Sequence, residues 1–329
     1  MKIVVEAGAT KSDWRILDAG TQRRILLPGM NVSTISMESN LHVFESGLAA
    51  ALSLPPEPAV DSSCQTCSGI PPRLSFRPEP AADLSFQPEP AADLSFRPER
   101  SGAEKPRSLD GLYIYTAGIV TPQVREQFTE RIRSLVDVPD IEIQDDLVAA
   151  ARAVCGREPG IVAILGTGSN ACQWDGSGVS FRVRSGGYII GDEGGGAALG
   201  KQFLADYIKC LVPADVAEDF ASSHDAGYEG IVSLVYKSAS PAGALGSLAP
   251  WLLERYSHPY VKGLIDSNFQ SFIDRSLKRY DTHLYPVGVV GGWGFACREI
   301  FSRLCSESGI SLGAFESEPI NGLVKYHIL

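Results

Sequence analysis

The chain has 329 residues, 44% of them hydrophobic, and a formal net charge of −10. Its length suits two packed domains, because single cores rarely grow past about 250–300 residues, and its acidity argues against nucleic-acid binding. No run of 18 apolar residues occurs and only a few apolar residues precede Glu6, so we expect no membrane span and no signal peptide, and a cytoplasmic protein.

The first half of the chain opens with three strands joined by short turns. Their pattern predicts an antiparallel meander at residues 2–5, 13–18 and 23–27. An amphipathic helix is predicted next, at 36–52. After a gap, the pattern predicts strands at 112–115 and 141–144, and helices at 121–136 and 145–155. Alternation of this kind is typical of an α/β fold.

One segment does not fit this pattern. Residues 74–83 read LSFRPEPAAD, residues 84–93 read LSFQPEPAAD, and 94–100 read LSFRPER. Prolines are frequent here, and proline removes backbone donors and interrupts helices and central strands. We therefore interpret about 55–108 as a disordered insertion, which a domain tolerates because loop-closure cost grows slowly with length. Phe76, Phe86 and Phe96 leave partner binding open as an alternative.

The second half repeats the order of the first. Strands are predicted at 161–165, 170–174 and 179–184, helices over 194–280, a strand at 287–290 and a helix at 293–307. Each half begins with a strand, a glycine turn and further strands, and then becomes helical. This internal similarity predicts two related domains with a cleft between them.

Cysteines and histidines carry no clear site. Cys64 and Cys67 form a lone C-x-x-C without the second pair that zinc needs, and the other five cysteines are scattered. We interpret them as thiols of a reducing cytosol. The five histidines lack ligand spacing, so we assign them no metal role.

The first candidate site is the turn from Gly8 to Lys11, which includes Thr10. A small-residue turn exposes backbone N–H groups and hydroxyls to phosphate oxygens, and Lys11 adds a positive charge. Glu6, at the end of the preceding strand, can hold Mg²⁺ directly or through water. An ordinary hairpin turn is the alternative.

The second candidate is the turn that contains Gly166, Thr167, Gly168, Ser169 and Asn170. It repeats the combination of amides and hydroxyls at a strand end. The letters also fit the dinucleotide pattern G-x-G-x-x-A, but that pattern requires a following helix, and a strand is expected here.

Two further glycine clusters follow. In the run from Gly191 to Gly194, Asp192 either takes part in binding or caps a helix. The later stretch up to Lys201 resembles a P-loop by chance, because no Ser or Thr follows the lysine. Gly291 and Gly292 end a strand, which suits either an adenine pocket or a tight turn.

Asp145 and Asp146 follow the predicted strand 141–144. A carboxylate at a strand end that faces a cleft can accept the proton of a sugar hydroxyl. Adjacent residues point in different directions, so we expect one of the two to cap the following helix.

Taken in order, these loops resemble the actin, hexokinase and heat-shock ATPase superfamily. More narrowly, the chain resembles the BadF/BadG/BcrA/BcrD ATPase family and its N-acetylglucosamine kinase branch. The resemblance is carried by residues 8–14, 166–170 and 191–194 and by the tail 319–327, and it covers the chain outside 55–108. It implies two ribonuclease H-like (actin-like ATPase) domains that flank a nucleotide and sugar cleft. One domain would span 1–156, with the tail 317–329 packing back on it, and the other 157–316.

The resemblance also implies roles for individual residues. ATP would be bound by two phosphate turns and by the later glycine pair, at Gly8, Thr10, Lys11, Gly166, Thr167, Gly168, Ser169, Gly291 and Gly292. The sugar would be held by Asn31, Thr116, Asn170 and Asp192. Asp146 would be the catalytic base, and Mg²⁺ would be held near Glu6, where the family usually has Asp.

The function implied is an ATP-dependent kinase that phosphorylates an amino sugar, N-acetylglucosamine first among them, on a hydroxyl. Two alternatives stay open: an ATPase that activates a partner enzyme, and a catalytically weak sugar sensor. The activators carry an iron–sulfur cluster on paired cysteines, a pattern that Cys155 and Cys172 do not match. The oligomeric state, a homodimer included, is left open.

Overall fold

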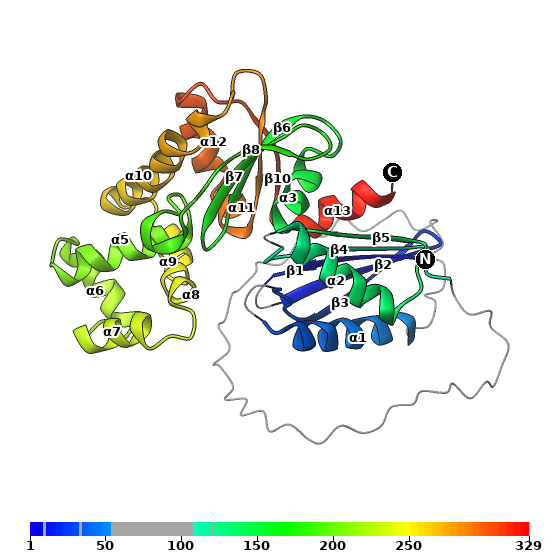
Figure 1. The fold of residues 1–329 in the computed structure, drawn as a ribbon. Coiled ribbons are helices and arrows are strands. Elements are labelled where there is room, and N and C mark those ends of the chain that lie inside the picture. Colours follow the sequence, from blue (N-terminus) through cyan, green and yellow to red (C-terminus); the bar gives the residue numbers. More distant parts are fainter. Residues whose placement is uncertain (9–10, 33–34, 54–107, 120, 329) are drawn as a thin grey trace, which may run out of the picture. The chain divides into compact units, whose positions relative to one another are not determined.

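The computed structural model describes residues 1–8, 11–32, 35–53, 108–119 and 121–328. The described part forms one compact unit built on two five-stranded sheets (Figure 1). The predicted insertion at 55–108 lies almost wholly outside this part, as do Cys64 and Cys67. Among the described helices, none combines the length and apolar character that a membrane span requires.

The N-terminal sheet has the strand order β3-β2-β1-β4-β5. Its first three strands form the predicted antiparallel meander, and the last two run parallel to β1. The strands are β1 (Lys2–Ala7), β2 (Lys11–Asp18), β3 (Thr21–Pro28), β4 (Gly111–Thr116) and β5 (Asp140–Gln144).

One face of this sheet is apolar and packs against α1 (Met37–Ser53) and α2 (Pro122–Leu135). Trp14 and Phe44 are fully buried there, with ring centroids 5.7 Å apart. A Cβ on Gly47 would lie 2.4 Å from the Trp14 ring, so glycine lets α1 approach the sheet. Thr121 caps α2 through the Val124 amide, as favoured at helix starts.

The C-terminal sheet has the order β10-β9-β6-β7-β8, which reproduces the connectivity of the first sheet. Three antiparallel strands are again followed by two parallel ones. The strands are β6 (Gly160–Leu165), β7 (Ser169–Trp174), β8 (Val179–Val183), β9 (Val287–Val290) and β10 (Leu312–Glu316). The two mixed sheets confirm the predicted α/β class.

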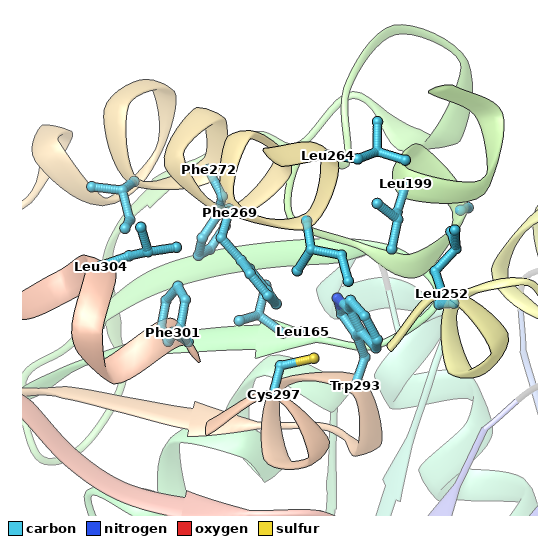
Figure 2. Close-up of a cluster of buried hydrophobic side chains, with 14 of the residues drawn as sticks. Leu165, Leu199, Leu252, Leu264, Phe269, Phe272, Trp293, Cys297, Phe301 and Leu304 are labelled. Atoms are coloured by element: carbon cyan, nitrogen blue, oxygen red, sulfur yellow. The ribbon is translucent and has the colours of Figure 1, made fainter. Parts of the chain in front are cut away.

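Helices enclose the larger core beside the second sheet. In Figure 2, Phe269, Phe272 and Phe301 gather beside Leu165 of β6 and Trp293. The helices are α4 (Gly187–Ile190), α5 (Gly196–Ile208), α6 (Ala214–Ser223), α7 (Tyr228–Tyr236), α8 (Pro241–Gly246), α9 (Ala249–Glu254), α10 (Pro259–Arg275), the 3₁₀ turn Leu277–Arg279, α11 (Gly292–Ala296) and α12 (Arg298–Glu307).

Two helices, α3 (Asp146–Val154) and α13 (Pro319–Ile328), pack on the other face of the N-terminal sheet, and α3 also packs on the second sheet. The α3 helix packs Leu147 and Ala150 against Cys172 of the second sheet. Its Ala149 packs with Val4 of the first sheet and with α13. Thus α3 belongs to the cores of both sheets.

The structure differs from the sequence-based elements in a few places. The helix predicted at 293–307 is two helices, because the buried Cys297 leaves helical geometry with ψ at 17°. The short helix α4, strand β10 and the regular C-terminal helix α13 were not predicted. Each of these elements is short or lies beside segments in which the periodicity of apolar residues is weak.

Candidate functional site

The first turn joins β1 to β2 and is closed by a hydrogen bond from the Gly8 amide to the Lys11 carbonyl, at 2.9 Å. The Lys11 ammonium donates to Glu318 Oε1 at 2.6 Å, next to the start of α13. Lys11, which was predicted to contact the phosphates of ATP, is therefore paired with a carboxylate in this structure. Thr10 lies outside the described residues.

Glu6 lies near the carboxyl end of β1, on the face that α13 covers. Its cross-strand neighbour on β2 is Asp13. The pKa of Glu6 is raised to about 7, chiefly by burial; Lys11 lowers it, and the charges of Asp13, Glu318 and Asp146 add to the rise. A cation at this position would relieve that repulsion.

A charge network behind this turn was not predicted from the sequence. The Asp13 carboxylate is buried and accepts from Arg15 at 2.9 Å and from Arg24 at 2.5 Å. Arg24 also reaches Glu318, at 3.1 Å. Arg15 and Arg24 are cross-strand partners on β2 and β3, but the link to Glu318 depends on a residue some 300 positions later in the chain.

Asp145 and Asp146 have separate tasks. The Asp145 side chain is the N-cap of α3 and accepts from the Val148 amide at 2.8 Å, as expected for one of the pair. Asp146 is the first residue of α3, and it is exposed to solvent. Many protein atoms nevertheless lie near its carboxylate and reduce the hydration of the charge. Desolvation and Asp145 raise its pKa, and Arg182 of β8 lowers it.

The second turn joins β6 to β7 and is held by the start of α5. The amides of Gly196 and Ala197 donate to the carbonyls of Gly166 and Thr167, at 2.9 and 2.8 Å. The N–H groups of Thr167 and Gly168 find no partner within the described chain. Two such amides side by side suit an anion.

A cavity of about 410 Å³ adjoins this turn. It is lined by small and apolar residues from the turn and from the helices α5, α8, α9 and α11, namely Gly166, Thr167, Gly196, Gly246, Ala249, Pro250, Leu253, Gly292, Trp293 and Ala296. A Cβ on Gly166 or Gly292 would meet no atom within 4 Å. These two glycines therefore keep the space free.

Gly291 and Gly292 have different reasons to be glycine. Gly291 has φ at 121°, and a Cβ there would lie 2.4 Å from the Leu165 carbonyl oxygen. Gly291 thus serves the tight turn, and Gly292 lines the cavity. Of the two alternatives that the sequence left open for this pair, the tight turn applies to Gly291, and the adenine pocket stays a prediction for Gly292.

The second turn also contacts Asp192. The Asp192 carboxylate accepts hydrogen bonds from the Ser169 amide and the Ser185 hydroxyl, and burial raises its pKa. The Ser169 hydroxyl donates to the Glu193 carbonyl at 2.7 Å, so it holds this loop. The N-cap of α5 is Gly195, and therefore Asp192 does not cap that helix.

Asn170 lines a smaller cavity of about 300 Å³ together with Ser185, Glu193 and Arg275. Its side-chain oxygen accepts from the Ala171 amide at 3.0 Å, which leaves its NH₂ group for a ligand. Lys201, the residue of the chance P-loop match, donates to the carbonyls of Tyr188 and Ile189 at the end of α4.

On the N-terminal sheet, Asn31 bridges to Ala117, directly after β4. The Thr116 side chain is fully buried and donates to the Met30 carbonyl at 3.0 Å, so its hydroxyl holds the segment that carries Asn31. Asn40 of α1, which the sequence did not suggest, is also fully buried and accepts from the Asn31 amide at 2.9 Å.

The predicted residues thus form two sets with one residue common to both sheets. Glu6, Lys11 and Asn31 belong to the first sheet, and the turn after β6, Asp192 and Gly292 to the second. Asp146 opens the helix that packs on both, and it influences the charge of Glu6.

This arrangement is the two-domain fold of actin-like ATPases and sugar kinases. A protein of Porphyromonas gingivalis, provisionally named an N-acetylglucosamine kinase, shares 27% identity with the chain at a TM-score of 0.77, over 99% of this chain and 98% of that one. A provisionally named N-acetylglucosamine kinase of Chromobacterium violaceum shares 19% identity at 0.67, over 99% and 98%.

A ROK-family glucokinase of Streptomyces griseus, solved with glucose and AMPPNP, shares 14% identity at a TM-score of 0.50, over 99% and 97%. At such identities the likeness shows the fold alone. Neither a family model nor a curated protein matches the sequence.

Proposed function

We propose that the chain is an ATP-dependent kinase that phosphorylates an amino sugar, N-acetylglucosamine first among them, on a hydroxyl. The observation that carries the proposal is the cavity beside the second turn, because it joins Gly166, Thr167 and Gly292 in one site. The likeness to the Porphyromonas gingivalis protein supports this choice of substrate class.

The residues around the cavity fit a nucleotide. The apolar helices leave room for a flat ring, and the glycines keep that room open. The free amides of Thr167 and Gly168 would donate hydrogen bonds to phosphate oxygens, while the Ser169 hydroxyl keeps the turn in place. Gly8, Thr10 and Lys11 would contact the phosphates from the first sheet.

Glu6 fits the role of holding Mg²⁺ in part. Magnesium keeps several waters and usually takes only one or two protein carboxylates beside substrate phosphates. In the described part of the chain, no three His, Cys, Asp or Glu residues converge as a metal site, in keeping with such sparse ligation. Bound there, Mg²⁺ would neutralise phosphate charge. Glu6 is one methylene longer than the usual Asp, so a bridging water suits its reach.

Asp146 would orient the acceptor hydroxyl and take its proton. A carboxylate with a raised pKa that stays open to solvent suits this role, because a base works best when its pKa approaches the operating pH. Phosphoryl transfer depends mainly on positioning and charge neutralisation, and these contacts supply both.

The sugar would be held from both sheets, by Asn31 on one side and by Asn170 and Asp192 on the other. Thr116 would act by fixing the Asn31 segment. The domains 1–156 and 157–316, with the tail 317–329 returning to the first, would then enclose the substrates. His327 near the end of this tail contacts Tyr115 of the first sheet.

The test is ADP release from ATP and Mg²⁺ with a panel of hexoses and hexosamines. We expect sugar-dependent turnover, highest with N-acetylglucosamine, and loss of turnover with retained sugar binding in Asp146→Asn. ATP hydrolysis that ignores every sugar would refute the proposal. A full rate in the variant would refute only the assignment of the base.

The cysteines argue against the activator alternative. A cluster shared with a partner needs cysteines at the protein surface, and Cys172 is fully buried within the second sheet.

A further inference from the structure

The loop between α4 and α5 has a backbone conformation that needs outside support. Asp192 has φ at 61°, in the left-handed region, and Gly194 has φ at 82°. A Cβ on Gly191 would lie 1.6 Å from the Ser185 carbonyl oxygen. Such conformations persist where the surroundings hold them. The position of the Asp192 carboxylate therefore depends on what holds the loop.

Asn268 of α10 holds the loop with both atoms of its amide. Its side-chain oxygen accepts from the Gly194 amide at 3.0 Å, and its NH₂ group donates to the Gly195 carbonyl at 3.2 Å. Of the four common amide and acid side chains, only Asn and Gln provide both an acceptor and a donor, and Gln is a methylene longer.

Neighbouring groups support the same clamp. The buried Trp293 indole donates to the Gly194 carbonyl at 3.0 Å. A Cβ on Gly194 would lie 2.7 Å from the Phe272 Cβ, one helical turn after Asn268. Residues four apart share a helix face, so α10 presents both residues to the loop.

The clamp leads directly to the two candidate binding groups. The Asp192 carbonyl accepts from the Gly195 amide at 3.0 Å, and the next amide, of Gly196, donates to the Gly166 carbonyl. The loop that Asn268 fixes is thus tied at one end to the carboxylate for the sugar and at the other to the turn for the phosphates.

We propose that Asn268 is a positioning residue for the kinase reaction, which sets the Asp192 carboxylate for the acceptor sugar by clamping the backbone at Gly194 and Gly195. This inference rests on the proposed function. It does not follow from the sequence motifs, because Asn268 lies more than 70 residues after the loop, within an ordinary amphipathic helix.

Asn268 also lines a separate cavity of about 730 Å³, so a side chain of similar size has room there. Asn268→Leu removes both hydrogen bonds at nearly constant volume, and Asn268→Asp keeps the acceptor but loses the donor. Ser271→Ala is the matched control, because Ser271 lines the same cavity and its hydroxyl donates to the Ser267 carbonyl of its own helix.

The experiment has two readouts on the full-length protein. Steady-state kinetics with N-acetylglucosamine and ATP should show the KM for sugar raised about 10- to 100-fold in Asn268→Leu, with the KM for ATP within about threefold of wild type. Asn268→Asp should fall between, and Ser271→Ala should match wild type. Hydrogen exchange, measured without substrates, should be faster in Asn268→Leu than in wild type at residues 192–197. The other folded regions of this variant should exchange at the wild-type rate.

The outcomes separate the inference from the proposed function. If wild type phosphorylates sugar and Asn268→Leu has an unchanged KM for sugar, the positioning role is overturned. The kinase proposal then stays intact. If the KM values for sugar and ATP rise equally in Asn268→Leu, and hydrogen exchange is faster throughout the second core, then Asn268 has only a structural role. A wild type that phosphorylates no sugar would overturn both.

Discussion

The pH dependence of stability should depend on His327, near the end of α13. Its ring stacks on Tyr113 with centroids 3.7 Å apart, and its Nε2 lies 2.7 Å from the Tyr115 hydroxyl. Arg152 donates to that hydroxyl oxygen at 2.7 Å, which leaves the hydroxyl proton for Nε2. Once protonated, Nε2 of His327 could no longer accept the Tyr115 hydroxyl proton. The imidazolium would also be repelled by the Arg152 charge.

The magnitude follows from the burial of the ring. His327 is 8% exposed, and desolvation, followed by Arg152, lowers its pKa from 6.5 to about 4. Below pH 6.5 the unfolded chain takes up a proton that the folded protein refuses until about pH 4. The free energy of unfolding therefore falls with pH across this window, by about 2 kcal/mol between pH 7.5 and pH 5 for this residue.

Urea unfolding at pH 7.5 and pH 5 measures this effect in wild type, His327→Gln and the control His42→Gln, which changes an exposed histidine of α1. Carboxylates that titrate in all three proteins cancel in the comparison. We expect His327→Gln to lose about 2 kcal/mol less than the other two on acidification. Equal losses in all three would refute the reasoning.

Two predictions concern the proposed nucleotide site. Gly292→Val places a side chain in the cavity of about 410 Å³ and should raise the KM for ATP at least about tenfold with unfolding unchanged, whereas Gly291→Val should lower thermal stability because its Cβ meets the Leu165 carbonyl. Reversed effects would contradict the division between the two glycines. Glu318→Gln frees Lys11 from its 2.6 Å ion pair and should lower the KM for ATP up to about fivefold at low salt, since exposed pairs are worth at most about 1 kcal/mol. A raised KM would show that the pair helps binding.

Local patterns sufficed for most of the framework. The strands 2–5 and 161–165 were predicted because each is a short apolar run followed by glycine, and both are central in their sheets. The division of labour at Asp145 and Asp146 was also predictable, because helix capping follows from adjacent residues.

Contacts distant in sequence explain what was missed. Glu318, Asn268 and Asn40 each act on backbone or charge that the fold brings to them, and no local period marks such residues. Ser169 was predicted as a ligand group from its place in a turn, and Thr116 from the family resemblance. Their hydrogen bonds to backbone carbonyls depend on neighbouring segments and were invisible in the sequence.

The place of α3 in both cores has a consequence for how the protein unfolds. Ala149 packs with the first core and Ala150 with the second, on adjacent positions of one nine-residue helix. Neither core keeps its full set of apolar contacts once this helix detaches. Loss of one half should therefore destabilise the other, and the two should melt in a single cooperative transition, with the α3 amides among the slowest to exchange.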